Sequence, residues 1–365
     1  MLMLPWVLCL SLLVLQVFPS SIPTRGTLLL SCEKKDSFRS ENDQKPALEV
    51  VAELLATRVI RHETDETNHK NQDNEIRPLR DQGFCNALFD IPSIGAIAKV
   101  FSPLAKARMK ASGFQMGDID RLLADKKLGP DILSTSPYGI LMSKIQQSAL
   151  TETQVHSSDA LSTLQVVATA LARVHAIPIP DQCPNMLWST LEVMLSMIPK
   201  EIAKPYREQV KWHKTTLESL QLPTVLGHGD CKPSNVIVIH GGAKFLDLEV
   251  AGRHYRAVDL AKFFRTSQRT KFSRRNQSEF LRAYLLERGG DAKLWTPREL
   301  KLESDLLLPM TWLEAAIFFE CSRHVDSDQR HIWKQRAEER MRDYWKCMKV
   351  HPATLDTYKT FRAKD

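Results

Sequence analysis

The segment "HGDCKPSNVIVIHGGAKFLDLE", residues 228–249, constrains the fold of this chain more than any other feature. Two short apolar runs, "NVIVI" and "AKFLDLE", flank the turn sequence "HGG", and this pattern predicts a β-hairpin. The loop before the first strand and the end of the second strand lie at the same edge of such a hairpin. Asp230 and Asn235 stand in that loop and Asp247 stands at that strand end. The hairpin therefore predicts that these three side chains converge.

Two carboxylates and an amide at one point suit phosphoryl transfer from ATP, which requires alignment and charge neutralisation more than covalent chemistry. One carboxylate is needed near the acceptor hydroxyl, and a cation is needed on the phosphates. Mg²⁺ prefers oxygen ligands and usually keeps several waters, so one Asp and one Asn suffice when ATP oxygens complete the shell. Asp230 and Asn235 have the D-x-x-x-x-N spacing of a kinase catalytic loop, and Asp247 stands where a kinase carries its metal-binding aspartate.

The composition is that of a globular protein with two lobes. A chain of 365 residues, 43% of them hydrophobic, can bury a large core. The net charge of +7 is spread along the chain, which weakly favours an anionic partner such as a nucleotide. Without an aromatic RNA-binding motif or zinc-finger spacing, nucleic acid is not an expected partner. The sequence sets no oligomeric state.

The first 18 residues, "MLMLPWVLCLSLLVLQVF", contain no charged side chain. The run is short for a membrane span and long enough for a signal-peptide core, so residues 1–20 are predicted to be a targeting leader. It would direct the chain to the endomembrane or secretory route, or to an organelle reached through it. Because Lys, Arg and a clean A-x-A site are missing, an uncleaved anchor or a bipartite address stays open. Membrane contact is expected only through this segment, if it stays uncleaved, and without a working leader the chain would be cytoplasmic.

The next part of the chain divides into a linker and a small lobe. Residues 21–80 are predicted to be a polar linker that contains an amphipathic helix at residues 47–60. Residues 81–150 form the predicted nucleotide-binding lobe. In it, "GFCNALFDI" and "GAIAKVFS" predict a strand hairpin, "GDIDRLLADKKLGP" predicts a helix, and "YGILMSKI" predicts a buried strand.

Residues 151–350 form the predicted catalytic and substrate lobe, followed by a tail at residues 351–365. The segment "DALSTLQVVATALARVHAIP" has the apolar spacing of a core helix, and "LLLPMTWLEAAIFFE" and "RAEERMRDYWKCMK" are also helical in character. The expected fold class is therefore α+β, with a small β-rich N-terminal lobe and a larger, mainly helical C-terminal lobe.

The motifs resemble those of a known superfamily. "HGDCKPSN" followed by "FLDLE" is similar to the catalytic loop and metal-binding segment of the aminoglycoside phosphotransferase and choline kinase superfamily, which has a protein-kinase-like fold. "VAGRHYRAVDLAKFF", "AEERMRDYWKCMK" and "GFCNALFDI" resemble further segments of choline and ethanolamine kinases, so the resemblance spans residues 80–350. It implies an ATP- and Mg²⁺-dependent kinase of a small-molecule hydroxyl, first of all ethanolamine or choline, acting in phospholipid headgroup synthesis.

The resemblance assigns roles around the hairpin. Asp230 would orient or deprotonate the acceptor hydroxyl, which is the catalytic role. Asn235 and Asp247 would hold Mg²⁺. Glu249 would assist a second metal ion or order the loop. His228 would brace the loop through ring hydrogen bonds, and a further acid, Asp259, would hold the catalytic loop in place.

The resemblance also assigns roles in the small lobe. Lys99, near the end of an apolar strand, would reach the phosphates of ATP. Gly83 and Asn86 would shape the turn above the nucleotide. Such a lysine usually has an acidic partner on the following helix, where this chain has no Glu at the start. Asp118 or Asp120 would take that place.

Aromatic side chains bear on the acceptor, because quaternary ammonium groups bind to aromatic faces. Choline kinases carry a tyrosine after the glutamate of the LDxE motif and two tryptophans on a late helix. Here Val250 follows that glutamate, and Trp312 is followed by alanines one turn on, so the cage is incomplete. The candidate substrate-binding aromatics are Trp312, Trp333 and Tyr344.

Two alternatives remain open at the level of sequence. The acceptor could be another amine-bearing metabolite, a sugar or an antibiotic-like compound, with the same chemistry as an aminoglycoside phosphotransferase. The chain could also be a nucleotide-binding pseudokinase that acts as a scaffold. The presence of Lys99, Asp230, Asn235 and Asp247 argues against a degenerate kinase, whereas the unsettled partner of Lys99 keeps that alternative open.

Overall fold

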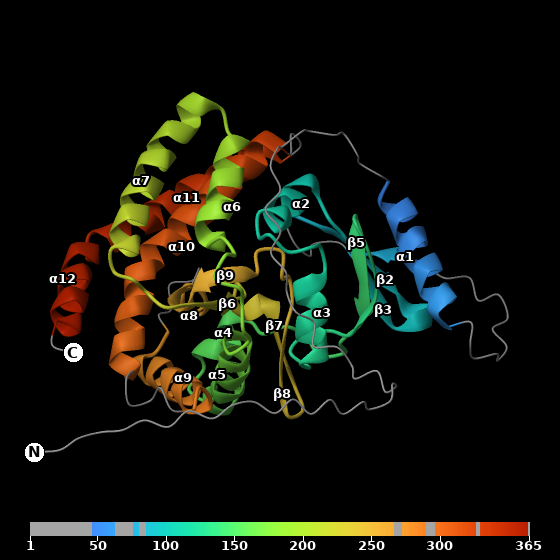
Figure 1. Cartoon of the computed structure of the whole chain (residues 1–365), viewed down its shortest axis with the longest axis horizontal. Coiled ribbons are helices and arrows are strands. Elements are labelled where there is room, and N and C mark those ends of the chain that lie inside the picture. The colour runs from blue at the N-terminus through green and yellow to red at the C-terminus, as the bar shows by residue number, and fades with distance from the viewer. Residues whose placement is uncertain are drawn as a thin grey trace, which may run out of the picture.

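The protein is described here by a computed structural model (Figure 1). The structure describes residues 46–62, 76–79, 85–265, 272–289, 296–325 and 329–363. The predicted leader and Gly83 lie outside these residues. Within them, no helix combines the length and the apolar character that a membrane crossing requires.

The N-terminal lobe is built on a five-stranded antiparallel sheet in the order β1-β2-β3-β5-β4. The predicted hairpin is confirmed, because β2 and β3 pair along their whole length and a short turn, η1, joins them. β4 was not predicted, because its sequence "ILSTS" is polar and half-buried, as befits an edge strand. The strands and the turn are β1 (Arg77–Pro78), β2 (Ala87–Ile91), η1 (Pro92–Ile94), β3 (Ala96–Val100), β4 (Ile132–Ser136) and β5 (Gly139–Ser143).

The helix α1 (Ala47–His62) packs on this sheet (Figure 1). Val50, Val51 and Leu54 are buried and share one apolar cluster with residues of β2, β3 and β5. The hydroxyl of Ser134 on β4 donates a hydrogen bond to the carbonyl oxygen of Leu54 at 2.7 Å. The predicted helix is thus present, but it is part of the N-terminal lobe, whereas the sequence placed it in a linker that ended at residue 80.

Two helices connect the strands of this lobe, α2 (Pro103–Lys110) and α3 (Asp118–Asp125). The N-terminus of α2 is capped by Ser102, whose hydroxyl accepts a hydrogen bond from the backbone N–H of Ala105 at 3.1 Å. The short, basic sequence of α2 lacks a clear apolar period, and this helix was not predicted. The predicted helix at α3 is confirmed and ends at Asp125, before the Gly and Pro that were expected to stop it.

The C-terminal lobe is mainly helical, as predicted, and contains two large apolar clusters. The long helix α10 runs through it and contacts α6, α7, α8, α9, α11 and α12. The helices are α4 (Glu152–His156), α5 (Leu161–His175), α6 (Met186–Ser196), α7 (Lys200–Glu218), α8 (Arg256–Phe264), α9 (Arg274–Glu287), α10 (Pro297–Val325), α11 (Arg330–Met348) and α12 (His351–Arg362). The predicted tail is therefore largely helical, and its His351 and Tyr358 are buried.

Two antiparallel strand pairs shape residues 228–249, one within this segment and one flanking it. β7 (Val236–Ile239) and β8 (Gly242–Phe245) form the predicted hairpin. β6 (Thr224–Gly227) and β9 (Gly252–Tyr255) pair on the other side. The backbone N–H of Leu246 donates to the carbonyl oxygen of Asn235 at 2.9 Å. This bond joins the two ends of the hairpin, so the predicted convergence of its loop and its second strand end is present.

The packing of α1 on the sheet generates a stability prediction. Truncating the fully buried Leu54 to Ala leaves a cavity between α1 and the sheet, so we expect the free energy of unfolding to fall by about 2–5 kcal/mol. Urea denaturation followed by fluorescence would measure it. The exposed Ala56 of the same helix is the control, and Ala56→Gln should stay within about 0.5 kcal/mol of the wild type. Equal stability of both variants would mean that α1 does not pack on the lobe in solution.

Candidate active site

The loop between β6 and β7 presents Asp230 together with Asn235. The side-chain nitrogen of Asn235, which ends the short turn η2 (Pro233–Asn235), donates to the backbone oxygen of Asp230 at 2.9 Å and to its carboxylate at 3.2 Å. The ammonium group of Lys232 donates to the same carboxylate oxygen at 2.8 Å. The amide oxygen of Asn235 accepts no hydrogen bond from the described residues. It is thus available to a cation, as the predicted metal role requires.

Asp230 lies among cations. Its second carboxylate oxygen is 3.5 Å from the ammonium nitrogen of Lys262, which comes from α8. Burial alone would raise the pKa of Asp230, but Lys232, Lys262 and Arg265 outweigh that effect and hold the pKa well below its usual range. Asp230 is therefore ionised throughout the physiological pH range.

Lys99 and Asp247 meet across the two lobes. The ammonium group of Lys99, buried on β3, is 2.5 Å from one carboxylate oxygen of Asp247. Burial alone would lower the pKa of Lys99, yet the carboxylates of Asp247 and Glu249 raise it above its ordinary value. Asp247 adopts a left-handed backbone conformation with φ of 64°, which costs a non-glycine residue about 1 kcal/mol or more. This strained conformation directs the carboxylate to the lysine.

Asp120 is the acid of α3 that interacts with Lys99. Burial raises the pKa of Asp120, the positive charge of Lys99 opposes that rise, and the negative charge of Asp247 adds to it. Asp118, the other candidate, pairs instead with Arg121 on its own helix at 3.2 Å. Of the two residues that the sequence left open, Asp120 is thus the one whose charge acts on Lys99.

Glu249 joins the lobes through a buried ion pair. One of its carboxylate oxygens accepts a hydrogen bond from Arg108 on α2 at 2.8 Å, and the other accepts one from the amide of Asn86 at 2.6 Å. Both members of the ion pair are buried. Both oxygens are thus bonded to residues of the small lobe, and these contacts suit the predicted ordering of the loop. The predicted metal role of Glu249 stays a prediction.

Asn86 links this pair to the start of α2. Its amide oxygen accepts a hydrogen bond from the backbone N–H of Ser102 at 3.2 Å, while its nitrogen holds Glu249. Asn86 stands directly before β2, where the predicted nucleotide turn ends. Its observed contacts fix the small lobe against the hairpin of the large one, and its role toward the nucleotide stays a prediction.

Asp259 on α8 holds the backbone of the catalytic loop in place. Its carboxylate accepts hydrogen bonds from the backbone N–H groups of His228 at 2.7 Å and Gly229 at 2.8 Å, and from the ring of His175 at 2.9 Å. Burial alone would raise the pKa of Asp259, but the hydrogen bond and charge of His175 lower it to about 2. These are the contacts that the predicted support of the loop requires.

His228 braces the same loop through its ring. Its Nε2 donates to the carbonyl oxygen of Leu246 at 2.8 Å, and its Nδ1 accepts from the backbone N–H of Asp230 at 3.2 Å. The ring thus spans the distance between the catalytic loop and the segment that carries Asp247. Gly229, between His228 and Asp230, has φ of 78°, and a Cβ there would lie 2.5 Å from the carbonyl oxygen of Val250. Only glycine fits this close approach.

The residues present fit a Mg²⁺ ion held together with a nucleotide. The described residues contain no group of three or more His, Cys, Asp or Glu side chains that could hold a metal ion. Asp247 and the amide oxygen of Asn235 offer two oxygen ligands at the joined ends of the hairpin. Mg²⁺ is usually bound by one or two such ligands, with waters and phosphate oxygens completing its shell.

Comparison with known proteins agrees with this geometry. The sequence profile described as choline/ethanolamine kinase matches residues 117–313, more than half of the chain. The chain belongs to the choline/ethanolamine kinase family. Human ethanolamine kinase 2 is 24% identical over 201 residues, which are 50% of this chain and 51% of that protein. The chain spans about half the length of the curated relatives it matches.

Solved structures share the fold of this family member. An ethanolamine kinase from Plasmodium vivax superposes with a TM-score of 0.64 at 17% identity, covering 87% of this chain and 98% of that one. An ADP-bound aminoglycoside phosphotransferase superposes with a TM-score of 0.51 at 16% identity, covering 79% of this chain and 96% of that one. At these identities the likeness concerns the fold alone. It confirms the predicted protein-kinase-like architecture.

The aromatic residues predicted to bind substrate are buried in this member of the family. Trp312 is 6% exposed, and the guanidinium carbons of Arg265 and Arg340 lie 4.7 Å and 5.3 Å from its ring centre. Trp333 stacks on Phe319 with ring centres 5.9 Å apart. The structure therefore presents neither indole as an open face, and their substrate role stays a prediction.

Tyr344, the third predicted aromatic, is fully buried in the core of the large lobe. Its hydroxyl donates to the side-chain oxygen of Gln209 at 2.8 Å and lies 3.2 Å from the ring nitrogen of His213. Both partners come from α7. These contacts describe a residue that packs α11 against α7, and its substrate role also stays a prediction.

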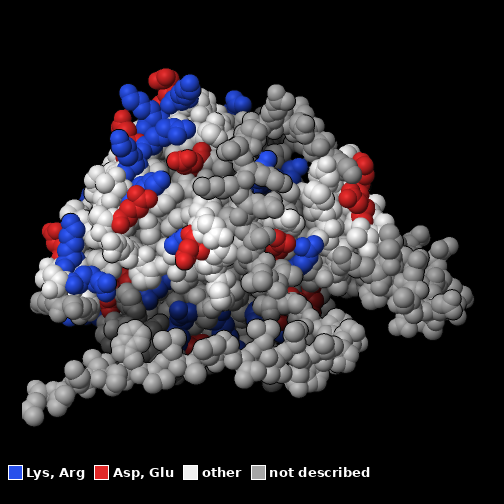
Figure 2. All heavy atoms as spheres, viewed as in Figure 1, with Lys and Arg blue, Asp and Glu red and all other residues white. Residues whose placement is uncertain are grey.

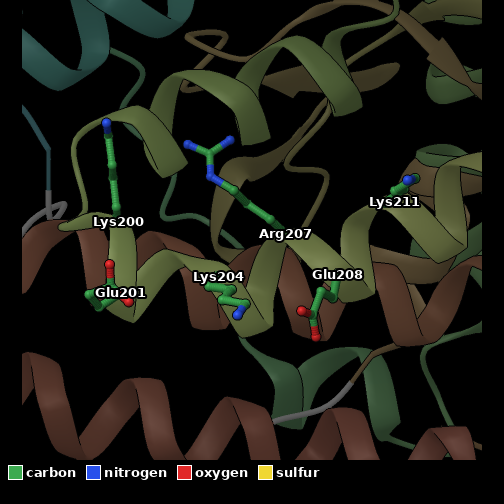
Figure 3. Close-up of a pocket in the computed structure, with 6 residues that line it drawn as sticks. All are labelled: Lys200, Glu201, Lys204, Arg207, Glu208 and Lys211. Atoms are coloured by element: carbon green, nitrogen blue, oxygen red, sulfur yellow. The ribbon is translucent and has the colours of Figure 1, made fainter.

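A hollow of about 480 Å³ lies on the outer side of α7 and shares no residue with the Asp230 site. Figure 3 shows its six charged side chains on one stretch of the helix, and Figure 2 shows Lys and Arg gathered at that end of the molecule. The lining residues are Lys200, Glu201, Lys204, Arg207, Glu208 and Lys211. Mixed charges on an open helix surface are those of a solvated face, so this hollow is not the candidate active site.

Several residues of the site were not predicted from the sequence. Lys232 stands within the quoted motif, and its place two residues after Asp230 could have revealed it. Lys262 and Arg265 stand three and six residues after Asp259, in a segment that the family resemblance already covered. Arg108 carried no local signal, because only the folded chain brings α2 against Glu249.

The buried carboxylate of Asp259 generates a pH prediction. Its pKa is lowered from 3.8 to about 2, so the carboxylate stabilises the fold above about pH 4, and this stabilisation is lost as the pH falls toward 2. Asp259→Asn turns an acceptor into a donor that faces two N–H groups. We expect it to lower the free energy of unfolding at pH 7 by about 2–4 kcal/mol. The fall in the free energy of unfolding that the wild type shows between pH 4 and pH 2 should be smaller in the variant.

Urea denaturation at a series of pH values would measure both effects. Asp131→Asn is the control, because Asp131 is exposed and its carboxylate pairs with Lys127, which is also exposed. Identical pH dependence of the wild type and Asp259→Asn would contradict the assignment of a lowered pKa to this carboxylate.

Proposed function

We propose that this protein transfers the γ-phosphoryl group of ATP to a hydroxyl group of a small molecule. The observation that carries the proposal is the meeting of four side chains at the joined ends of one hairpin. Asp230 is hydrogen-bonded to Asn235, Asp247 is paired with Lys99, and the backbone bond from Leu246 to Asn235 ties the two pairs together. Membership of the family and the ADP-bound structural neighbour support ATP as the phosphoryl donor.

Asp230 would act mainly by orienting the acceptor. Its pKa lies well below the usual range, so the carboxylate accepts a hydrogen bond from the acceptor hydroxyl but is a weak base. Phosphoryl transfer passes through a loose transition state, in which the acceptor oxygen gains little charge before its bond to phosphorus forms. A weak base that fixes the direction of attack is sufficient for such a reaction.

The cations would neutralise the transferred group. Lys99 reaches the common edge from β3 and is held there by Asp247, and Lys232 lies against Asp230 from the other side. Asn235 and Asp247 would hold Mg²⁺, which neutralises charge on phosphate oxygens when it is bound. Pre-set charges of this kind stabilise developing charge without reorganisation during the reaction.

Ethanolamine and choline are the reference acceptors, because the family and its named relatives point to amino alcohols. If either is the substrate, the protein would act in phospholipid headgroup synthesis. Another hydroxyl compound would use the same four side chains, as the shared fold with an aminoglycoside phosphotransferase illustrates. The acceptor is therefore best identified by direct comparison of compounds that differ in charge.

Removing the carboxylate of Asp230 tests the proposed reaction. We expect Asp230→Asn to lower kcat by about 10²- to 10⁴-fold, because the amide orients the hydroxyl poorly and cannot accept its proton. Phosphorylated product formed from Mg-ATP and ethanolamine, choline or glycerol would be quantified by mass spectrometry. Asp159→Asn, at an exposed position, is the matched control. ATP binding without product from any acceptor would favour the nucleotide-binding scaffold instead.

Lys232 provides a second test through pH dependence. Because its charge lowers the pKa of Asp230, Lys232→Met should raise that pKa and move the acid limb of the kcat profile to higher pH. Because this limb lies at or below the ordinary aspartate range, the profile would be recorded from about pH 3 to 8 with the best acceptor of the first experiment, and circular dichroism would check folding at each pH. Lys126→Met, at an exposed position, should leave the profile in place. An unmoved acid limb in Lys232→Met would show that Asp230 does not govern it.

A further inference from the structure

A group of cations adjoins Asp230 on the side of the large lobe. Lys262 and Arg265 come from α8 and the residue after it, and Arg340 comes from α11. The ammonium group of Lys262 is 3.5 Å from Asp230, and the guanidinium carbons of Arg265 and Arg340 lie within 5.3 Å of the ring centre of Trp312. Lys262 thus borders the place where the acceptor hydroxyl would lie, and the two arginines lie over Trp312.

Two of these charges have carboxylate partners. Lys262 contacts the carboxylate of Glu314 on α10. Arg340 is 3.5 Å from the carboxylate of Asp343, one turn on in its own helix, and that carboxylate also binds Lys346 at 3.0 Å. The pair of Lys262 and Glu314 is nearly fully buried and leaves little net charge.

Arg265 differs from the other two. Its guanidinium group donates to the backbone carbonyl oxygen of Thr311, and no carboxylate of the described residues lies within 4 Å of it. The carboxylates of Asp230, Glu314 and Glu152 act on it only from a greater distance. The site therefore contains one partly buried guanidinium group that lacks a contacting counterion within the described part of the chain.

Burying an unneutralised cation in this place costs free energy unless an anionic ligand binds to it. Burial lowers the pKa of Arg265 and the neighbouring charge of Arg340 lowers it further, while the carboxylates of Asp230, Glu314 and Glu152 raise it. A guanidinium group offers a rigid fork of donors that matches a carboxylate or a phosphate. A guanidinium group with donors left beyond its bond to Thr311, beside a second arginine, can recognise such an anion.

The same arrangement disfavours a cationic ligand. An ammonium group seeks an aromatic face, and Trp312 is the aromatic residue nearest to these cations. Its ring already carries two guanidinium groups, at 4.7 Å and 5.3 Å. An ammonium group placed there would displace them or be repelled by them.

The cations around Asp230 divide into two sets. The charge of Lys232 acts on Asp230 and Asp247, at the edge where the phosphates and the metal ion are expected. The charge of Asp230 also acts on Arg265, but the two residues that contact its guanidinium group, Thr311 and Trp312, belong to α10. The first set suits the transferred phosphoryl group, and the second set lies where the rest of the acceptor would extend.

We propose that the acceptor is an anionic alcohol, whose carboxylate or phosphate group binds Arg265 while its hydroxyl lies at Asp230. The inference rests on the proposed function and sets the charge of its substrate. In the reaction the acceptor oxygen forms a bond to the γ-phosphorus, the bond from that phosphorus to the bridging oxygen of ADP breaks, and the hydroxyl proton is released. The product is a phosphate ester that carries two anionic groups.

Binding to the full chain tests the inference separately from catalysis. Calorimetric titrations would compare glycerol 3-phosphate, glycerate, choline and ethanolamine in the presence of ADP and Mg²⁺. We expect the two anions to bind more tightly than the two amino alcohols, and Arg265→Gln to weaken binding of the anions by about tenfold or more. Arg336→Gln is the matched control, since Arg336 lies over Phe319 and Trp333 and not beside Asp230. It should leave every dissociation constant unchanged.

Turnover of the same four compounds with Mg-ATP gives the second measurement. The inference would be supported if glycerate or glycerol 3-phosphate is phosphorylated with a higher kcat/KM than the two amino alcohols, and if Arg265→Gln lowers that kcat/KM mainly by raising KM. The better of the two anions would show which anionic group is preferred. Choline or ethanolamine as the better substrate would overturn the inference and leave the proposed function intact. Anion binding that depends on Arg265 without any turnover would support the site and contradict the proposed function. Anion binding that is absent, or unchanged in Arg265→Gln, would overturn the inference.

Discussion

The buried ion pair between Arg108 and Glu249 is the interaction on which the geometry of the site depends. It joins α2 of the small lobe to the segment after the hairpin of the large lobe, and Asn86 completes it. Such a pair adds little to net stability, because the cost of desolvating both charges offsets their attraction, but the loss of one partner is expensive. The ion pair instead fixes the position of the two lobes relative to each other. Asp247 lies two residues before Glu249, so the same contact that docks the lobes sets the distance from Asp247 to Lys99.

A second constraint acts from within the large lobe. Asp259 holds the backbone of the catalytic loop, and His228 ties that loop to the segment before Asp247. Both ends of the hairpin are thus anchored independently of any ligand. The left-handed backbone of Asp247 persists because these contacts determine its surroundings on both sides. A site that needs little rearrangement to align its charges is well suited to phosphoryl transfer, in which alignment accounts for most of the rate.

The sequence predicted the parts of this site that are local. Asp230, Asn235 and Asp247 lie within one hairpin, whose strand lengths and turn residues determine where its ends meet, and Lys99 lies on a strand with a clear apolar pattern. The parts that the sequence did not reveal depend on contacts between distant segments. The pairing of Glu249 with Arg108 was not predicted, because nothing near Glu249 in the sequence reveals an arginine 141 positions away. Likewise α1 was assigned to a linker, since its polar flanks are visible in the sequence but the sheet beneath it is not.

The stacking of Arg265 and Arg340 on Trp312 could not be predicted either, because it requires the end of α8 and the helix α11 to meet over α10. This stacking changes the functional role that can be inferred for Trp312. Taken alone, a late tryptophan in this family favours a site for an ammonium group, since an aromatic face attracts any cation. Once side-chain guanidinium groups lie over that ring, the same attraction holds them in place, and the proposed anion would bind their remaining donors. In that proposal, an aromatic residue that would otherwise select a cation supports the arginines that select an anion.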